Sequence, residues 1–419
     1  MSEKYPASVR RSGPVELPER LGPDGSDPGR YAYVILGAGC AGLSLCYCLL
    51  ERGVRGRILI LDRKERFEDD RTWCFWDVEP TPFSHLAVKS WTSWSVHAEG
   101  RNVVHTTDRY PYLCLPATEF YRHALARIAA HDNVTVRLGE AVEGYKDLSD
   151  GVLVRTSEGV YPADKVFDGR GLPPGSPAFE KARANSRWVS QEFLGLRLRT
   201  GRRVFDPSVC TLMDFSVSQG RGLRFVYVLP FGDREALVEN VYLSGARVSP
   251  EEHRAEISGY LDERYGLSTG DYAVDGEERG HIPMTDYPFP RRLGERVYSV
   301  GMLGGETRPS TGYTFLRIQR YCRALAESLA GYDAVAEKVH PRRYDLLDGL
   351  FLRFVRDRPE DCPGVYARMF AGVPPDPLVR FLTEKSTPRD EARLVAALPK
   401  GPFLRLAGRG ILERLRDVV

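Results

Sequence analysis

The sequence predicts an α/β fold in which a Rossmann-like dinucleotide-binding domain holds an inserted β-rich domain and is followed by a helical region. Three observations predict it. A glycine-rich turn follows an apolar run near residue 37, strand-like runs fill residues 186–290, and apolar residues recur at helical spacing after residue 331. A chain of 419 residues is long enough for two or three subdomains around a large interior.

The composition excludes two classes of protein. Lys and Arg total 59 and Asp and Glu total 57, so a net charge of +2 argues against nucleic-acid binding, which depends on phosphate neutralisation. The eight cysteines form no C-x-x-C pair and have no partner at zinc-finger spacing. We therefore expect reduced thiols in a cytoplasmic protein and no metal site.

The N-terminal fifty residues divide into two parts. Residues 1–30 are rich in Pro, Gly and charge and lack the apolar core of a signal peptide, so we expect a flexible tail. Residues 31–50 carry no charge over twenty positions, which is long enough for a membrane span. Their three glycines fit a strand, a turn and a helix better, and we expect no transmembrane helix.

The first motif is a G-x-G-x-x-G turn after the apolar run at residues 33–36, formed by Gly37, Gly39 and Gly42 with Ala38 between the first two. The first glycine permits the tight turn, the second lets a pyrophosphate approach the backbone, and the third lets helix and strand pack closely. Free N–H groups at the start of the following helix then meet the phosphate charge.

A second predicted strand, at residues 57–61, ends at Asp62, twenty residues beyond Gly42. A carboxylate at this strand end accepts hydrogen bonds from a ribose 2′-OH, and it would repel a 2′-phosphate. The motif therefore favours FAD or NAD over NADP.

A second glycine-rich segment favours FAD. A predicted strand at residues 296–300 is followed by Gly301, by a turn containing Pro309, Thr311, Gly312 and Tyr313, and by a helix. This resembles the second flavin motif of flavoproteins related to glutathione reductase, which sets a helix N-terminus against the flavin and favours an anionic reduced form. The usual Asp is replaced by Met302, and plain structural turns are the alternative reading. The chain has no second G-x-G-x-x-G for a nicotinamide.

Strand-like segments and the return of the chain near Gly169, itself an expected cofactor-binding residue, give the expected domain boundaries. The expected units are a flexible tail at 1–30, a dinucleotide-binding domain in two parts at 31–185 and 291–330, a β-rich substrate domain at 186–290, and a helical C-terminal region at 331–419.

Five segments occur in the order found in a known family, at residues 70–76, 166–171, 225–230, 280–284 and 309–313. Over residues 31–400 the sequence resembles the FAD-dependent lycopene β-cyclases of bacteria and plants. The resemblance implies an isomerase (an intramolecular lyase) that closes the ψ-end groups of lycopene into the β-rings of γ- or β-carotene without net redox change. It also implies reduced FAD and NAD(P)H or another external reductant. A β and an ε ring would differ only in which proton leaves.

Glu239 is the expected proton donor. It follows a predicted strand at the place where the family carries an essential Glu, and burial among apolar residues would raise its pKa. Bacterial members resemble I-E-D-T there, but this chain has Asn240 in place of the second acid. A Glu exposed on a strand edge is the alternative.

The resemblance assigns further side chains to the site. Arg71 and Thr72 would line the cofactor. Glu277 and Glu278 are interpreted as solvated loop acids rather than a proton relay. The residues expected to contact the substrate are mainly aromatic, namely Trp73, Phe75, Trp76, Tyr227 and Met284.

Lycopene is dissolved in membranes, so the resemblance implies peripheral association with a membrane surface and contact with other carotenoid-pathway enzymes. The candidate docking segments are apolar and flanked by Arg, and an ordinary packed helical region is the alternative. They are a stripe of Leu346, Leu347, Leu350, Phe351, Phe354 and Val355 and shorter runs at 381–382, 394–398 and 403–406.

Three other functions fit the same motifs. A flavin monooxygenase would normally keep the Asp at position 302, and a geranylgeranyl-type reductase would saturate double bonds and add mass. A non-enzymatic carotenoid-binding protein would survive loss of Glu239. The segment at 70–76 and Glu239 favour the cyclase.

Overall fold

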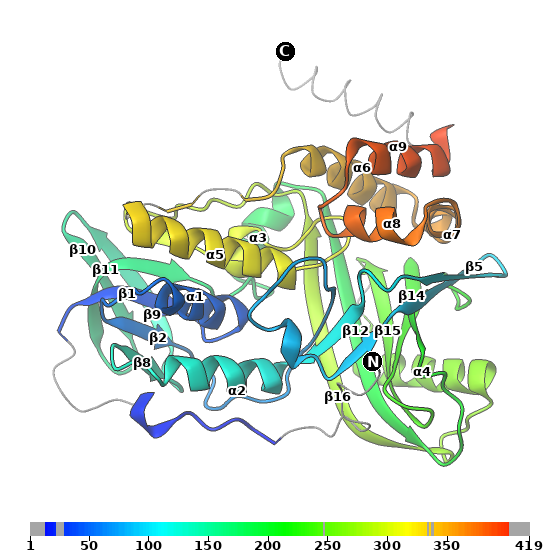
Figure 1. Ribbon diagram of the computed structural model, residues 1–419, viewed down its shortest axis with the longest axis horizontal. Coiled ribbons are helices and arrows are strands. Elements are labelled where there is room, and N and C mark those ends of the chain that lie inside the picture. Colours follow the sequence, from blue (N-terminus) through cyan, green and yellow to red (C-terminus); the bar gives the residue numbers. More distant parts are fainter. Residues whose placement is uncertain (1–12, 22–28, 246–247, 333–334, 337–338, 402–419) are drawn as a thin grey trace.

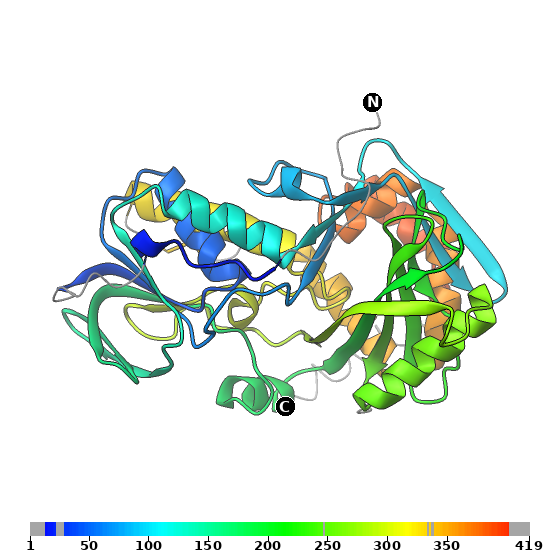
Figure 2. The same cartoon turned by 90° about the horizontal axis from the view of Figure 1, so that it is seen from below.

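The computed structural model describes residues 13–21, 29–245, 248–332, 335–336 and 339–401. Two sheet-containing bodies lie side by side along the long axis, and the C-terminal helices sit above the second one (Figure 1, Figure 2). The first body carries the two glycine-rich motifs, and the second carries the β-rich segment.

The first sheet has the strand order β8-β2-β1-β11-β10-β9, and β17 also pairs with β11. Its parallel core is β8 (Val134–Arg137), β2 (Ile58–Leu61), β1 (Tyr31–Leu36), β11 (Val160–Asp168) and β17 (Val297–Ser299). The strands β10 (Gly151–Thr156) and β9 (Val142–Leu148) add an antiparallel edge. This arrangement confirms the Rossmann-like α/β prediction.

Alternation of side chains along the parallel strands builds a core on each face of this sheet. Ile35, Ile58 and Ile60 point to one face, where α1 (Cys40–Glu51), α2 (Ala117–Ile128) and α5 (Phe315–Tyr332) cover them. Val34 and Leu59 point to the other face, where they pack against side chains of the antiparallel edge.

The second sheet has the order β16-β12-β15-β14-β13-β5-β6. Two helical layers cover it: α4 (Pro250–Tyr265) packs on one face, and the C-terminal helices α6 (Arg343–Asp357), α7 (Cys362–Gly372), α8 (Pro375–Leu382) and α9 (Pro388–Ala397) pack on the other. The strands are β16 (Tyr272–Thr285), β12 (Trp188–Thr200), β15 (Glu235–Ser244), β14 (Leu223–Pro230), β13 (Val209–Asp214), β5 (Ser93–Ala98) and β6 (Arg101–Thr106).

A small third sheet, β3-β7-β4, joins the two bodies. Its strands are β3 (Thr72–Trp76), β7 (Tyr112–Pro116) and β4 (Lys89–Trp91). The remaining described elements are α3 (Pro177–Ala184) and the 3-10 helices η1 (Glu19–Leu21), η2 (Ser84–Leu86), η3 (Gly301–Gly304) and η4 (Pro359–Asp361).

Two parts of the chain differ from the expected boundaries. Residues 93–106 were expected in the dinucleotide-binding domain, but β5 pairs in parallel with β13 of the second sheet. Within the expected tail, Val15 forms a bridge with Phe67 and Leu21 is fully buried, because these apolar side chains pack against the first body. Residues 1–12 and 22–28 lie outside the described residues.

The uncharged segment at residues 31–50 forms the strand β1, a turn and the helix α1, as the glycines predict. In the described part of the chain, no helix is both long and apolar enough to cross a membrane. All eight cysteines are free thiols, and the described His, Cys, Asp and Glu side chains form no group able to hold a metal ion.

The apolar stripe of α6 is buried at its C-terminal end and partly exposed at its N-terminal end. Phe354 and Val355 are buried in the core of the second body, and Leu346 is the member left 60% exposed. Packing on the second sheet therefore covers the C-terminal part of the stripe, and the interpretation of its remaining residues as a membrane-facing surface stays a prediction. The run at 403–406 lies outside the described residues.

Candidate active site

The first glycine motif has the geometry of a phosphate-binding turn. Gly37 has φ +100°, and a Cβ at Gly42 would lie 1.9 Å from the carbonyl oxygen of Gly37, so both positions need glycine. A Cβ at Gly39 would have no atom within 4 Å. Gly39 is the N-cap of α1 without a side-chain cap, so the first N–H groups of α1 face open space.

Asp62 lies beside this turn, as the strand–turn–helix–strand order predicts. Its Oδ2 accepts a hydrogen bond from the N–H of Ala38 at 2.6 Å, and its Oδ1 accepts one from the N–H of Lys64 at 2.9 Å. The carboxylate is therefore held at the end of β2, where a ribose hydroxyl would meet it.

Gly169 and Gly301, far along the chain, pack against the first glycine motif. Gly169 donates to the carbonyl of Leu36 at 2.8 Å, and a Cβ at Gly301 would lie 2.7 Å from the Cβ of Ala41 in α1. Gly301 also has φ +64°. A glycine turn with open space, a carboxylate at the strand end and uncapped helical N–H groups together fit a dinucleotide.

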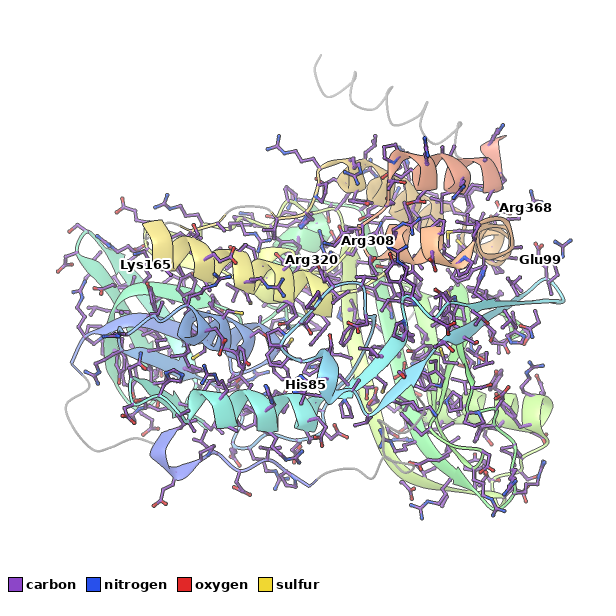
Figure 3. All side chains as sticks on the ribbon, viewed as in Figure 1. His85, Glu99, Lys165, Arg308, Arg320 and Arg368 are labelled. Atoms are coloured by element: carbon purple, nitrogen blue, oxygen red, sulfur yellow. The ribbon has the colours of Figure 1, made fainter. Side chains whose placement is uncertain are left out.

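The turn that contains Pro309, Thr311 and Tyr313 begins at a buried ion pair. Arg308 donates to Asp348 of α6 at 2.8 Å and to the carbonyls of Phe381 and Leu382 in α8, and it lies between α5 and the C-terminal helices (Figure 3). On the other side of the turn, a Cβ at Gly312 would lie 2.8 Å from Oε1 of Gln191 on β12. The turn thus packs between β12 of the second sheet and the helices α6 and α8.

Three neighbouring strands of the second sheet place two carboxyl groups together. Gly195 of β12 pairs with Glu239 of β15 on one side and with Glu278 of β16 on the other. A Cβ at Gly195 would lie 2.8 Å from Cγ of Glu239. Because position 195 has no side chain, no group on β12 separates the two carboxyl groups, and Glu278 is close enough to raise the pKa of Glu239.

Glu239 is 8% exposed, and its surroundings favour the neutral acid. Burial raises the pKa of the Glu239 carboxyl well above its usual range, and the neighbouring Glu278 carboxyl raises it further. The predicted burial of Glu239 is therefore confirmed, and its carboxyl lies on a sheet face inside the protein rather than at an exposed edge.

The side chain at position 240 lies on the opposite face of β15 from Glu239, so an acid there would not face the Glu239 carboxyl. Residues alternate between the faces of a strand, so Asn240 points away from Glu239. It accepts from Nε of Arg224 at 2.7 Å and donates to Glu256 of α4 at 2.7 Å. The second carboxylate of the site is Glu278, which lies on β16 rather than in a loop.

Other groups complete the wall around the two carboxyl groups. The hydroxyl of Thr72 donates to Oε2 of Glu278 at 2.7 Å, and Cys74, on the same face of β3, is close enough to affect the pKa of Glu239. The Tyr227 hydroxyl donates to the Tyr112 hydroxyl at 3.1 Å. Arg71 precedes β3 and has a side chain 57% exposed.

The aromatic residues of β3 separate by face. Trp76 lies against Tyr112, with ring centroids 4.6 Å apart, on the side of Glu239. Trp73 and Phe75 point the opposite way and pack against Phe315 of α5. Met284 is fully buried in the core of the second body. The predicted substrate residues are therefore not one continuous wall, and the contacts assigned to them remain predictions.

Comparison with known proteins identifies the family. The family model described as "Lycopene cyclase protein" matches residues 33–407. The chain belongs to the lycopene cyclase family. It is 25% identical to the lycopene beta-cyclase of Pantoea ananas over 89% of this chain and 96% of that protein. It is also 25% identical to the lycopene beta-cyclase of Pseudescherichia vulneris over 92% and 98% of the two chains.

Solved structures share the fold of this lycopene cyclase family member. A geranylgeranyl bacteriochlorophyll reductase-like protein from Thermoplasma acidophilum aligns with a TM-score of 0.59 and 12% identity, over 90% of this chain and 99% of that one. A flavoprotein/dehydrogenase from Cytophaga hutchinsonii aligns with a TM-score of 0.55 and 15% identity, over 85% and 93%. These likenesses support the Rossmann-like fold.

Sequence reasoning missed two features of this family member's site. Gly195 was not singled out, and Glu278 was interpreted as a solvated loop acid together with Glu277. The alternation of β16 separates the two acids: Glu277 pairs with Arg254 and Arg279 on the opposite face. Strand alternation predicts only that Glu277 and Glu278 lie on opposite faces, and the long-range register decides which of them faces Glu239.

Proposed function

We propose that the protein is a lycopene β-cyclase that closes the ψ-end groups of lycopene into β-rings, giving γ- or β-carotene with no net redox change. The observation that carries this proposal is Glu239, an acid buried beside aromatic side chains in a member of the lycopene cyclase family. A neutral carboxylic acid in an apolar site is the group that protonates an unactivated double bond.

The reaction begins when Glu239 gives its proton to C2 of the terminal double bond, which leaves a tertiary cation at C1. The electrons of the C5–C6 double bond form the C1–C6 bond, and the positive charge moves to C5. Loss of the C6 proton restores a double bond and gives the β-ring. The rings of Trp76, Tyr227 and Tyr112 face this side of the site and would stabilise the cation through their π-faces.

The proposed cofactor is FAD in its reduced form, with NAD(P)H or another external reductant. The turn at Gly37, Gly39 and Gly42 would hold the pyrophosphate, Asp62 the ribose, and the turn after Pro309 the flavin end. When bound, reduced FAD would supply negative charge that stabilises a cation, an effect that is larger in a dry site than in water.

The experiment for this proposal is expression in a lycopene-accumulating bacterium, followed by chromatography and mass spectrometry of the pigments. We expect a new carotenoid with the mass of lycopene, lost in Glu239→Gln and kept in Glu235→Gln, which changes a half-buried Glu at the start of the same strand. A heavier product would instead indicate a reductase or a monooxygenase, and unchanged lycopene would contradict the proposal.

We also propose peripheral attachment to a cytoplasmic membrane surface, because the substrate is a hydrocarbon dissolved in lipid, and other carotenoid-pathway enzymes would be met there. Support comes from Leu346 of α6 and Val395 of α9, which are 60% and 55% exposed on the C-terminal helices. Vesicle co-sedimentation should weaken in the double variant Leu346→Asp/Val395→Asp. It should not change in Val160→Asp, an equally exposed valine of β11; equal losses would contradict the attachment site.

A further inference from the structure

We propose that Glu239 and Glu278 share one proton and that Glu278 is the ionised partner that keeps this proton on Glu239. Glu278 is thus a positioning residue, since it acts on the substrate only through Glu239. The inference rests on the proposed function, because it names the group that holds the proton donor in its acid form.

The register of three neighbouring strands places the two carboxyl groups side by side. Glu239 and Glu278 flank Gly195 on the two neighbouring strands of β12, in register and on one face of the sheet. Glu239 lies over position 195, where a Cβ would be 3.0 Å from its Oε1. Two neighbouring carboxylates on one buried sheet face repel each other when both are ionised, so the pair retains one proton.

The two sites are unequal, which decides where the proton resides. Glu239 is 8% exposed, whereas Glu278 is only half-buried. The Thr72 hydroxyl donates to Oε2 of Glu278 at 2.7 Å, and a donated hydrogen bond stabilises the charged form of a carboxylate. The negative charge therefore belongs on Glu278, and the proton stays on the more deeply buried Glu239.

Titratable side chains reach Glu239 from the other packed strands. They are Glu278 of β16, Cys74 of β3 and Tyr227, which lies directly opposite Glu239 on β14. Arg197 lies two residues from Gly195 on the same face of β12, and its guanidinium lies 4.9 Å from the ring centroid of Phe231. The neighbouring carboxyl and thiol thus favour the neutral form of Glu239.

The pH dependence follows from the sign of this effect. Cyclisation needs protonated Glu239, so activity persists below the pKa of Glu239 and is lost as the pH rises through it. Removing the charge of Glu278 lowers that pKa, and the alkaline limb of the activity profile then moves to lower pH. Activity on the acid side of the profile remains.

The test compares the wild type with Glu278→Gln, Glu278→Asp and the matched control Glu277→Gln. The control removes the neighbouring carboxylate on the opposite face of β16, where Arg254 and Arg279 hold it. In each purified, flavin-loaded protein, the carboxylic-acid C=O band of Glu239 is titrated by infrared difference spectroscopy and identified by its loss in Glu239→Gln. The pH profile of lycopene cyclisation is measured in parallel.

We expect the midpoint of the Glu239 band and the alkaline limb to fall together by about one pH unit or more in Glu278→Gln. At a pH on that limb, this is about a tenfold loss of activity. Glu278→Asp should retain most of the wild-type midpoint, and Glu277→Gln should not move it. An unmoved midpoint in Glu278→Gln, or an equal fall in Glu277→Gln, would overturn the inference.

The infrared measurement also separates this inference from the proposed function. If the wild type forms no cyclised carotenoid while the midpoint still falls in Glu278→Gln, the proposed function fails and the carboxyl pair stands. If cyclisation proceeds with an unmoved midpoint, the cyclase stands and the role of Glu278 is rejected.

Discussion

The space occupied by the Glu239 side chain exists because residue 195 is a glycine. A Cβ there would lie 2.8 Å from Cγ and 3.0 Å from Oε1 of Glu239. We predict that Gly195→Ala lowers cyclisation at least about tenfold and lowers stability by about 1–3 kcal/mol through overpacking. The measurements are the cyclisation rate and urea unfolding.

The control for this prediction is Gly259→Ala. A Cβ at Gly259 in α4 would meet nothing within 4 Å, and alanine is the better helix former, so this variant should be at least as stable as the wild type. Equal activity in Gly195→Ala and the wild type would show that Glu239 does not need the space above residue 195.

The pKa of Glu239 also makes stability depend on pH. Its folded pKa is raised well above the unfolded value of about 4.3, so its stabilising contribution is complete below that value and declines as the pH rises toward the folded pKa. We predict that Glu239→Gln removes this decline, so that its Tm rises relative to the wild type from pH 5 to pH 8. The difference in unfolding free energy should grow by up to about 1.4 kcal/mol per pH unit.

Thermal unfolding followed by circular dichroism at several pH values checks this prediction. Glu158→Gln changes an exposed carboxylate in a turn and should show a constant difference from the wild type across the same range. A constant difference in Glu239→Gln as well would contradict a raised pKa in the folded protein.

At the scale of elements, the parts of the site predicted from sequence are those in which the informative residues are close along the chain. The strand, turn and helix around Gly37 and the acid at Asp62 lie within thirty residues of one another and have the predicted geometry. Glu278 escaped prediction because its role depends on the register of β15, β12 and β16. No local pattern shows which residues those long-range pairings bring opposite each other.

The same limit applies to β3 and α6. A run of aromatic residues at 72–76 suggests one wall, but alternation sends Trp73 and Trp76 to different bodies of the protein. An apolar stripe on a helix indicates a buried face without saying whether protein or lipid covers it. In α6 the core of the second body covers Phe354 and Val355, while Leu346 stays exposed.

The buried ion pair of Arg308 and Asp348 ties the turn before α5 to α6, with a donor–acceptor distance of 2.8 Å and both side chains almost fully buried. Asp348→Ala leaves a buried guanidinium without its counter-charge. We predict a loss of about 3–5 kcal/mol in the free energy of unfolding, measured by urea denaturation.

The matched control is Glu68→Ala, which breaks an exposed ion pair. Arg66 and Glu68 lie 2.6 Å apart with side chains more than half exposed, and breaking such a pair costs less than about 1 kcal/mol. A loss in Asp348→Ala no larger than in Glu68→Ala would mean that the buried pair does not hold the turn in place.

At the scale of the whole molecule, the two glycine motifs and the proton donor come from different bodies that the third sheet joins. Gly39→Ala separates cofactor binding from folding, because the added Cβ meets no protein atom but enters the space assigned to the pyrophosphate. We predict unchanged stability of the cofactor-free protein and an FAD Kd at least about tenfold higher, or about 1.4 kcal/mol.

Flavin fluorescence titration measures the Kd, and FAD at a hundred times the wild-type Kd should stabilise the wild type by about 2.7 kcal/mol. Gly144→Ala, at a second glycine with open space around its Cβ position, should bind FAD as the wild type does. If Gly39→Ala binds FAD with wild-type affinity, the pyrophosphate does not bind at this turn.

The measurement that tests the central claim most directly is a count of rings formed per electron pair. The purified protein is loaded with FAD, reduced anaerobically with a limiting amount of reductant, and given excess lycopene. Redox-neutral acid catalysis by Glu239 predicts many rings per electron pair, a product with the mass of lycopene, and no product from Glu239→Gln. One product per electron pair, with two added hydrogens, would contradict it and make the protein a reductase.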